Sequence, residues 1–178
     1  EALRECLTTF KNLLIERANQ PPKGDLVSML AHSPMVNMDD QQLLSTLILL
    51  IIGGNDTTRN SISGGLLALM KNPNELAKLR ADPSLVKSLV PEIIRWQTPL
   101  THMRRTTTRE VQVRGVTIPA GEKVVMWYLS GNRDEQVIEN ADRFVVDRKN
   151  PRHHLSFGFG IHRCVGNRLA EMQIRILW

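Results

Sequence analysis

Cysteine is scarce in this chain of 178 residues, which contains only Cys6 and Cys164. Two cysteines do not make a disulfide framework of the kind that stabilises small secreted domains. The first residues also lack the basic and apolar regions of a secretory signal peptide. We therefore expect a cytoplasmic location.

Long apolar runs and clustered charge are missing as well. The longest apolar run, Leu43 to Ile52, is interrupted by Ser45 and Thr46 and is too short to cross a bilayer. The formal net charge is +5, but the basic residues are dispersed and aromatic residues make up only 4% of the chain. This pattern argues against nucleic-acid binding. A positive patch around Arg163 and Arg168 for an acidic electron-transfer protein is an alternative to a merely solvated surface.

The hydrophobic content of 42% is enough for one sizeable core, and no internal repeat interrupts the sequence. The chain begins at Glu1 rather than at a methionine and ends at Trp178, inside an apolar helical pattern. We expect residues 1–178 to be a single partial domain, a fragment of a longer protein.

The predicted fold class is mainly α with a small antiparallel β region. Apolar spacing indicates helices over residues 1–18 and 26–31, and a long helix from a capping box at Asp39 and Gln42 to about Met70. Two further helix starts are signalled by Asn72-Pro73, with Glu75 completing a second capping box, and by Asp82-Pro83, and the last helix ends near Trp96. Alternating residues predict strands over 111–118 and a buried strand over 124–129.

One lone cysteine lies in an unusual setting. Residues 157–166 read F-G-F-G-I-H-R-C-V-G, and the residues after Cys164 favour a helix. A thiolate is stabilised at a helix start or beside a cation, and an axial thiolate on haem iron favours cleavage of the O–O bond of dioxygen. Gly158, Gly160 and Gly166 allow positive φ or close approach to a flat macrocycle. Phe157 and Phe159 are expected to shield the sulfur; the alternative is an ordinary buried cysteine.

The middle of the long helix is also unusual, because Gly53-Gly54-Asn55-Asp56-Thr57-Thr58 places glycines and polar residues between apolar flanks. One interpretation is close packing against a crossing helix. The other is a distorted turn that makes room for dioxygen, with Thr57 as hydroxyl donor and Asp56 as proton relay.

Glu92 and Arg95 lie three residues apart, on one face of a helix whose neighbouring residues are apolar. An exposed pair of this kind stabilises little, whereas loss of one partner from a buried pair costs about 3 to 5 kcal/mol. Pro91 is expected to kink this helix.

In this order, these segments resemble the cytochrome P450 family. The haem-binding signature F-x-x-G-x-H-x-C-x-G matches at Phe157, Gly160, His162, Cys164 and Gly166, and the oxygen-activation motif G-G-x-D-T matches at Gly53, Gly54, Asp56 and Thr57. The resemblance implies that Glu92 and Arg95 form a structural pair completed by Arg143, although the usual proline is replaced by Ala141. It also implies that Arg105 contacts the haem propionates, whereas His162 and Arg163 are placed to meet either the propionates or a partner protein. The family position further implies a substrate pocket lined by Leu49, Ile52, Leu100, Thr101 and Met103, and ordinary loop packing is the alternative for the last three.

The sequence segments around the motifs resemble those of the bacterial P450 subfamily of medium-chain alkane terminal hydroxylases. The resemblance implies haem b as cofactor, O₂ as co-substrate, and conversion of n-alkanes to 1-alkanols. Electrons would come from NAD(P)H through a ferredoxin reductase and a ferredoxin.

Three alternatives remain open at this point. The chain could belong to a P450 that hydroxylates fatty acids, terpenoids or sterol side chains. It could use peroxide as a peroxygenase, although Asp56 and Thr57 favour dioxygen as the oxidant, or it could be a haem-binding or sensory module without turnover.

Overall fold

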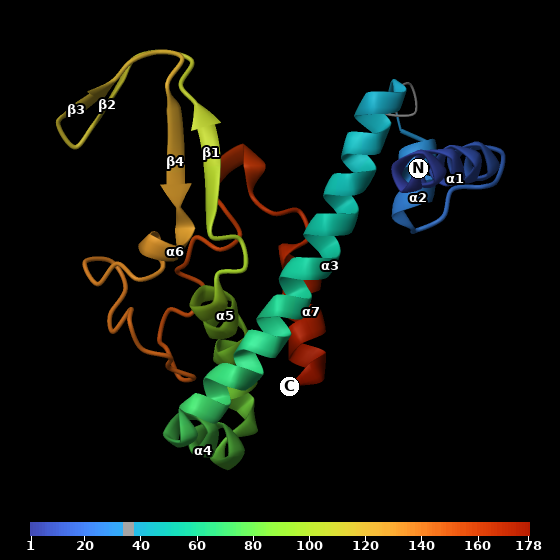
Figure 1. The fold of residues 1–178 in the computed structure, drawn as a ribbon. Helices are drawn as coiled ribbons and strands as arrows, with labels where there is room; N and C mark the ends of the chain where they lie inside the picture. The colour runs from blue at the N-terminus through green and yellow to red at the C-terminus, as the bar shows by residue number, and fades with distance from the viewer. Residues whose placement is uncertain (34–37) are drawn as a thin grey trace. The chain divides into compact units, whose positions relative to one another are not determined.

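The computed structural model describes residues 1–33 and 38–178, and it confirms a mainly α fold with small antiparallel sheets (Figure 1). The helices are α1 (Ala2–Ala18), α2 (Leu26–Ala31), α3 (Asp40–Lys71), α4 (Pro73–Ala81), α5 (Val86–Gln97), α6 (Tyr128–Gly131) and α7 (Asn167–Leu177). Short 3₁₀ turns span Pro83–Leu85 and Gly160–His162. The chain forms two compact units, residues 1–53 and residues 54–178.

The first unit has a small core of its own. Leu14, Ala31, Leu43 and Leu47 are buried together, from α1, α2 and the first turns of α3. The predicted capping box at the start of α3 is confirmed, because the Gln42 amide donates to Asp39 Oδ1 at 2.8 Å and the Asp39 amide donates to Gln42 Oε1 at 3.3 Å. This reciprocal pair satisfies two backbone donors at the helix start.

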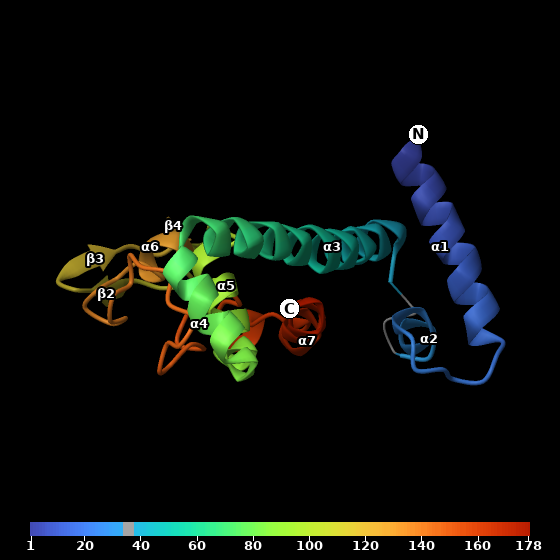
Figure 2. The ribbon, with the colours of Figure 1, turned by 90° about the horizontal axis from the view of Figure 1, so that it is seen from below.

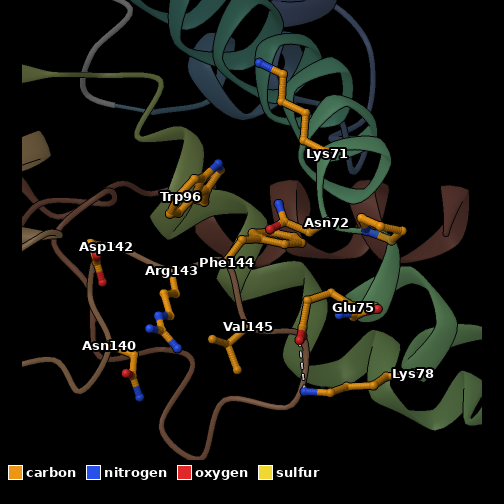
Figure 3. A pocket seen from close by; sticks show the side chains of 12 residues that line it. Lys71, Asn72, Glu75, Lys78, Trp96, Asn140, Asp142, Arg143, Phe144 and Val145 are labelled. Atoms are coloured by element: carbon orange, nitrogen blue, oxygen red, sulfur yellow. Dashed lines mark ion pairs between the residues drawn. The ribbon is translucent and has the colours of Figure 1, made fainter.

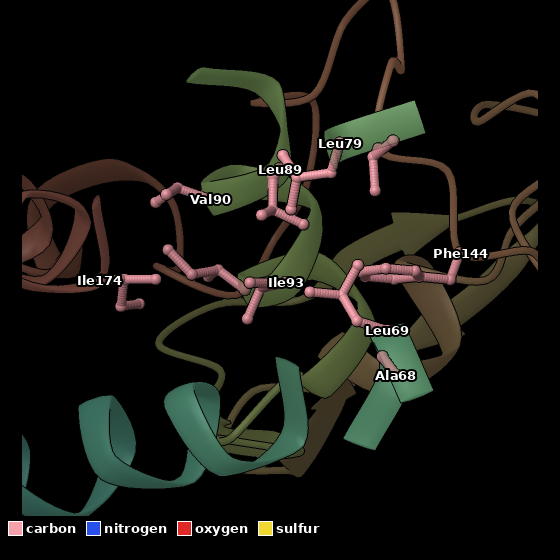
Figure 4. Packing of buried hydrophobic residues seen from close by; sticks show 10 residues of the cluster. Ala68, Leu69, Leu79, Leu89, Val90, Ile93, Phe144 and Ile174 are labelled. Atoms are coloured by element: carbon pink, nitrogen blue, oxygen red, sulfur yellow. The ribbon is translucent and has the colours of Figure 1, made fainter. Parts of the chain in front are cut away.

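The second unit is built around a larger core, drawn in Figure 4. Its buried residues come from the last turns of α3, from α4, α5 and α7, and from the irregular segment before α7: Ala68, Leu69, Leu79, Leu89, Val90, Ile93, Ile94, Phe144, Val146 and Ile174. The α5 helix is central to this core because the run Leu89 to Arg95 is buried along its whole length. Helix α5 is therefore the helix against which the other members of this core pack.

Glycines allow α5 to lie against the C-terminal half of α3 (Figures 1 and 2). A Cβ atom at Gly65 would lie 2.7 Å from Ile93 Cδ1, and one at Gly64 would collide with the Gln97 side chain. By contrast, within the described residues a Cβ atom at Gly53 or Gly54 would meet nothing within 4 Å. The close helix crossing considered for Gly53 and Gly54 thus occurs at Gly64 and Gly65, further along α3.

The start of α4 differs from the predicted capping box. The Asn72 side chain donates back to the Ala68 carbonyl at 2.8 Å, and it does not cap α4. Glu75 instead accepts a hydrogen bond from the Val146 amide at 2.8 Å and pairs with Lys78. The Glu75 carboxylate therefore binds a backbone amide that is distant in sequence, that of Val146, instead of capping the start of α4.

Among the described residues, the β region consists of two two-stranded sheets. Strand β1 (His102–Thr106) pairs with β4 (Lys123–Trp127), and β2 (Val111–Val113) pairs with β3 (Val116–Ile118), both antiparallel. The β2–β3 hairpin lies in the connection between β1 and β4. The sequence did not predict β1. The expectation of a buried strand is wrong for β4, whose residues alternate between half-buried and exposed.

Within residues 1–33 and 38–178, no helix combines the length and the apolar character needed to cross a membrane.

Candidate functional site

The Cys164 loop, residues 155–166, is held by its own backbone. The Cys164 amide donates to the Phe157 carbonyl at 2.8 Å, and the Gly158 amide donates to the Leu155 carbonyl at 2.7 Å. The 3₁₀ turn Gly160–His162 lies inside the larger closure. The predicted helix after the cysteine is confirmed as α7, but it begins at Asn167, after a turn at Val165 and Gly166, and Gly166 is its N-cap.

Two of the three loop glycines have the predicted conformation. Gly158 has φ +69° and Gly160 has φ +72°, a region that residues with a Cβ atom rarely adopt. Gly166 has φ −89°, so its role is not a positive φ. A Cβ atom at Gly166 would lie 4.0 Å from Cys164 Sγ, an ordinary van der Waals distance.

The outer face of the loop is apolar and exposed. Phe159, Ile161 and Val165 are 82%, 96% and 94% exposed, and the free thiol of Cys164 is exposed among them. The prediction that phenylalanines shield the sulfur is wrong within this chain. Phe157 packs instead against the core and against the His154 ring, with centroids 5.6 Å apart.

The donor set at Cys164 is a single thiol. Within the described part of the chain, no three histidine, cysteine, aspartate or glutamate side chains gather as a metal cluster would require. One soft ligand among exposed apolar residues suits a macrocycle that itself supplies the equatorial donors to its iron. These residues therefore fit haem, which needs one axial thiolate and an apolar wall.

The predicted oxygen-activation residues lie in an unbroken α-helix. Every residue of α3 from Asp40 to Lys71 is α-helical. The expected distorted turn therefore does not appear as a break in the helix or as a change to another helix type. Asp56 forms an exposed ion pair with Arg59, which the sequence did not single out. Thr57 is half-buried, and its carbonyl accepts a hydrogen bond from the Ser61 hydroxyl at 2.9 Å.

The other predicted contact residues are exposed, except for Arg105. Arg105 is half-buried in β1, opposite Val124, and its guanidinium donates to the Arg104 carbonyl at 2.9 Å. His162 is exposed. The five residues predicted to line a substrate pocket are exposed too: Leu49, Ile52, Leu100, Thr101 and Met103. Their roles stay predictions.

A hollow of about 610 Å³ lies elsewhere, between the start of α4, the end of α5 and the segment 140–145 (Figure 3). It contains no thiol, and Arg143 is the one predicted site residue that lines it. Lys78 at its edge already pairs with Glu75 and Asp147. The chemistry predicted for the chain therefore does not lie in this hollow.

Glu92 and Arg95 form the predicted ion pair, and both side chains are fully buried. The Arg95 guanidinium donates to both carboxylate oxygens of Glu92 at 2.8 Å. Glu92 also accepts from the Val145 amide at 2.9 Å. The pair is thus buried and bidentate rather than exposed.

The prediction that Arg143 completes this pair is wrong, because the second guanidinium on Glu92 belongs to Arg148, at 2.7 Å. Arg143 is exposed and contributes only its backbone carbonyl, which accepts from Arg95 and Arg148. The physical reason is the way this irregular segment, which contains turns and no strand, packs against the core. Phe144 and Val146 are buried, so Arg148 follows them inward while Arg143 points outward.

His154 is a site residue that the sequence did not reveal. It lies just before the Cys164 loop, and its Nδ1 accepts from the Ser156 amide at 3.3 Å. Burial lowers the pKa of His154 from 6.5 to about 4, with Arg95 and Arg163 acting in the same direction and Glu92 and Glu171 opposing. The imidazole is therefore neutral near pH 7.

Comparisons with known proteins bear on these residues together. A family model described as Cytochrome P450 matches residues 2–178. Linalool 8-monooxygenase of Pseudomonas putida is 41% identical over 171 residues, which cover 95% of this chain and 42% of that protein.

Two solved structures are similar in both sequence and fold. Cytochrome P450-153 from Novosphingobium aromaticivorans has a TM-score of 0.93 and 53% identity over 98% of this chain and 44% of that chain. CYP153D17 from Sphingomonas sp. PAMC 26605 has a TM-score of 0.92 and 55% identity over the same shares. The chain thus spans less than half the length of the relatives it matches.

The two arginines near Glu92 allow a matched test of which one stabilises it. Arg148→Ala removes a charge partner from a buried carboxylate and is expected to lower the free energy of unfolding by about 3 kcal/mol. Arg143→Ala removes an exposed side chain and should cost less than about 0.5 kcal/mol. Chemical denaturation of both variants checks this; equal losses, or a larger loss for Arg143→Ala, would contradict the assignment.

His154 predicts a pH dependence of stability. Because its folded pKa is depressed, the unfolded chain binds one more proton between about pH 6.5 and 4, so stability is full above pH 6.5 and falls as the pH drops through this window. The shift corresponds to about 3 kcal/mol. His154→Asn keeps an acceptor for the Ser156 amide and should flatten the dependence, whereas His153→Asn, an exposed neighbour, should not. Denaturation at several pH values would show it.

Proposed function

Because this chain belongs to the cytochrome P450 family, we propose that it is the C-terminal portion of the catalytic domain of a haem-thiolate monooxygenase. The observation that carries the proposal is the exposed free thiol of Cys164 on a backbone-closed loop with an apolar outer face. The proposal that residues 1–178 are one partial domain rests on the chain spanning 42% to 44% of its relatives.

Cys164 would supply the axial thiolate to haem b, and the positive φ of Gly158 and Gly160, with no Cβ atoms, would allow the backbone to approach the flat macrocycle closely. Phe157, Gly166 and the exposed apolar residues of the loop would contact the macrocycle. Arg105 and His162 are the cations proposed for its propionates. When bound, thiolate-ligated haem supplies the electron density that favours cleavage of the O–O bond of dioxygen.

Asp56 and Thr57 are proposed to move protons toward bound dioxygen, next to Gly53 and Gly54 on the same helix. The Asp56 carboxylate is exposed and paired with Arg59, an arrangement that lets it exchange protons with solvent when the pair opens. The Thr57 hydroxyl is the group proposed to hold the proton at the end of this path.

The proposed reaction is terminal hydroxylation of a medium-chain n-alkane to a 1-alkanol, with electrons from NAD(P)H through a ferredoxin reductase and a ferredoxin. This substrate class is supported by the residues around the motifs and by the identity of 53% and 55% to the two solved structures, cytochrome P450-153 and CYP153D17. Leu49, Ile52, Leu100, Thr101 and Met103 are proposed to contact the hydrophobic substrate. Hydroxylation of another hydrophobic molecule is the second candidate, favoured by the 41% identity to a linalool monooxygenase.

Replacing the proposed ligand gives the direct test. Cys164→Ser in the haem-loaded, full-length protein should abolish the red-shifted Soret band of the ferrous carbon monoxide complex, because serine does not supply a thiolate. Cys6→Ser is the matched control, since it removes the other free thiol and should leave the band in place. A Cys164→Ser protein that keeps the band would refute the ligand assignment.

Thr57 is tested by the yield of product per reductant consumed. With ferredoxin, its reductase and n-alkanes of graded length, the wild-type protein should form 1-alkanols, whereas Thr57→Ala should oxidise reductant with a several-fold lower product yield. Thr57→Ser keeps the hydroxyl and should recover most of the yield. Unchanged coupling in Thr57→Ala would remove the proton-delivery role, and products from other substrates alone would favour the second candidate.

A further inference from the structure

A buried polar cluster, the Asn132 cluster, lies behind the Cys164 loop. It consists of Thr98, Asn132 and Ser156, which are 0%, 0% and 8% exposed. The Asn132 amide group donates to Thr98 Oγ1 and to Ser156 Oγ, both at 2.9 Å. Its carbonyl oxygen, Oδ1, accepts from the Leu155 amide at 2.7 Å. Every polar atom of this side chain thus has a partner.

On one side, the Asn132 cluster holds the start of the Cys164 loop. Asn132 fixes the Leu155 amide, and Leu155 in turn accepts from Gly158 through its carbonyl. The Ser156 hydroxyl donates to the Ile94 carbonyl of α5 at 2.8 Å. The next residue, Phe157, is the acceptor for the Cys164 amide. Two hydrogen-bond steps therefore join Asn132 to the backbone of the cysteine.

On the other side, the cluster is anchored to the buried charges. Arg95 donates to the backbone carbonyl of Asn132 at 2.7 Å, and the Thr98 hydroxyl donates to the backbone carbonyl of Arg95 at 2.6 Å. Thr98 has φ +41°, a conformation that is costly for a β-branched residue and persists only when its surroundings enforce it. Here the Thr98 hydroxyl bonds both the Arg95 carbonyl and the Asn132 amide group, and these bonds hold Thr98 in this conformation. Together with the bond from Arg95, they also hold Asn132 in place relative to α5.

We propose that Asn132 is a positioning residue for the Cys164 loop, setting its place relative to α5 through Leu155 and Ser156. The site requires two N–H donors and one acceptor on a short side chain. Asparagine provides that set, whereas aspartate lacks the donors and alanine lacks all three groups. This inference rests on the proposed role of Cys164 as the haem ligand.

The test compares three variants of the full-length, haem-loaded protein. Asn132→Ala removes the whole link, and Ser156→Ala removes only the hydroxyl on the loop side. Thr98→Val has a similar shape and breaks a hydrogen bond to Asn132 on the α5 side, away from the loop. The readouts are amide hydrogen exchange of residues 155–166, the ferrous carbon monoxide spectrum and the free energy of unfolding.

Positioning predicts that Asn132→Ala speeds exchange in residues 155–166 roughly tenfold, as expected for loss of a buried hydrogen bond, and loses part of the red-shifted band. Ser156→Ala should shift both readouts in the same direction by less. Thr98→Val should lose stability while changing both readouts less than Ser156→Ala does, because Arg95 still holds the Asn132 backbone carbonyl and the contacts to Leu155 and Ser156 remain.

Wild-type exchange and spectrum in both Asn132→Ala and Ser156→Ala would overturn the proposal, because the cluster would then contribute only to stability. If Asn132→Ala does not fold, the comparison of Ser156→Ala with Thr98→Val decides between the same two outcomes. A wild-type protein without the red-shifted band would refute the proposed function, while the exchange data would still test the positioning of the loop.

Discussion

The carboxylate of Glu92, buried with no solvent contact, is the constraint on which the second unit depends. A buried charge is tolerated only when it is paired and all its hydrogen-bonding capacity is used. Glu92 accepts from Arg95, Arg148 and the Val145 amide. Arg95 uses its remaining donors on the carbonyls of Asn132, Ala141 and Arg143. The cluster therefore fixes backbone as well as charge.

This use of the backbone explains how a long irregular segment can lie against a helical core. Residues 132–148 contain no helix or strand, so their carbonyls and amides lack the partners that regular structure supplies. Arg95 and Arg148 take over that role for five carbonyls, at positions 132, 139, 140, 141 and 143. Because each arginine bonds several carbonyls, loss of either one would release several backbone groups together.

Local patterns were enough to predict much of the fold. The capping box at Asp39 and the helix after Cys164 depend on residues close in sequence, and the structure has both. The positive φ of Gly158 and Gly160 also follows from residue type. These features need no knowledge of distant segments.

Features that depend on distant packing were missed. Glu75 fits a local cap but bonds the Val146 amide, 71 residues away. Arg143 fits a family position, yet the burial of Phe144 and Val146 turns it outward and Arg148 inward. The sequence has glycine pairs at Gly53-Gly54 and at Gly64-Gly65, and α5 approaches the second pair. A glycine permits close packing but does not identify the helix that packs against it, so the sequence could not show which pair lies at the crossing. In each case, the deciding partner lies in another element.

The candidate site divides into a polar back and an apolar front. Behind the Cys164 loop, the charges of Glu92 and Arg95 and the side chain of Asn132 are fully hydrogen-bonded and resist displacement. In front, Phe159 and Val165 leave the sulfur accessible. The proposed role of Cys164 as an axial ligand requires a sulfur that keeps its position and an outer face that is open to an apolar group. One loop meets both requirements when its hydrogen-bonded anchors lie on the side away from that face. Substitutions behind the loop should therefore change its position, and substitutions in front should change what it binds.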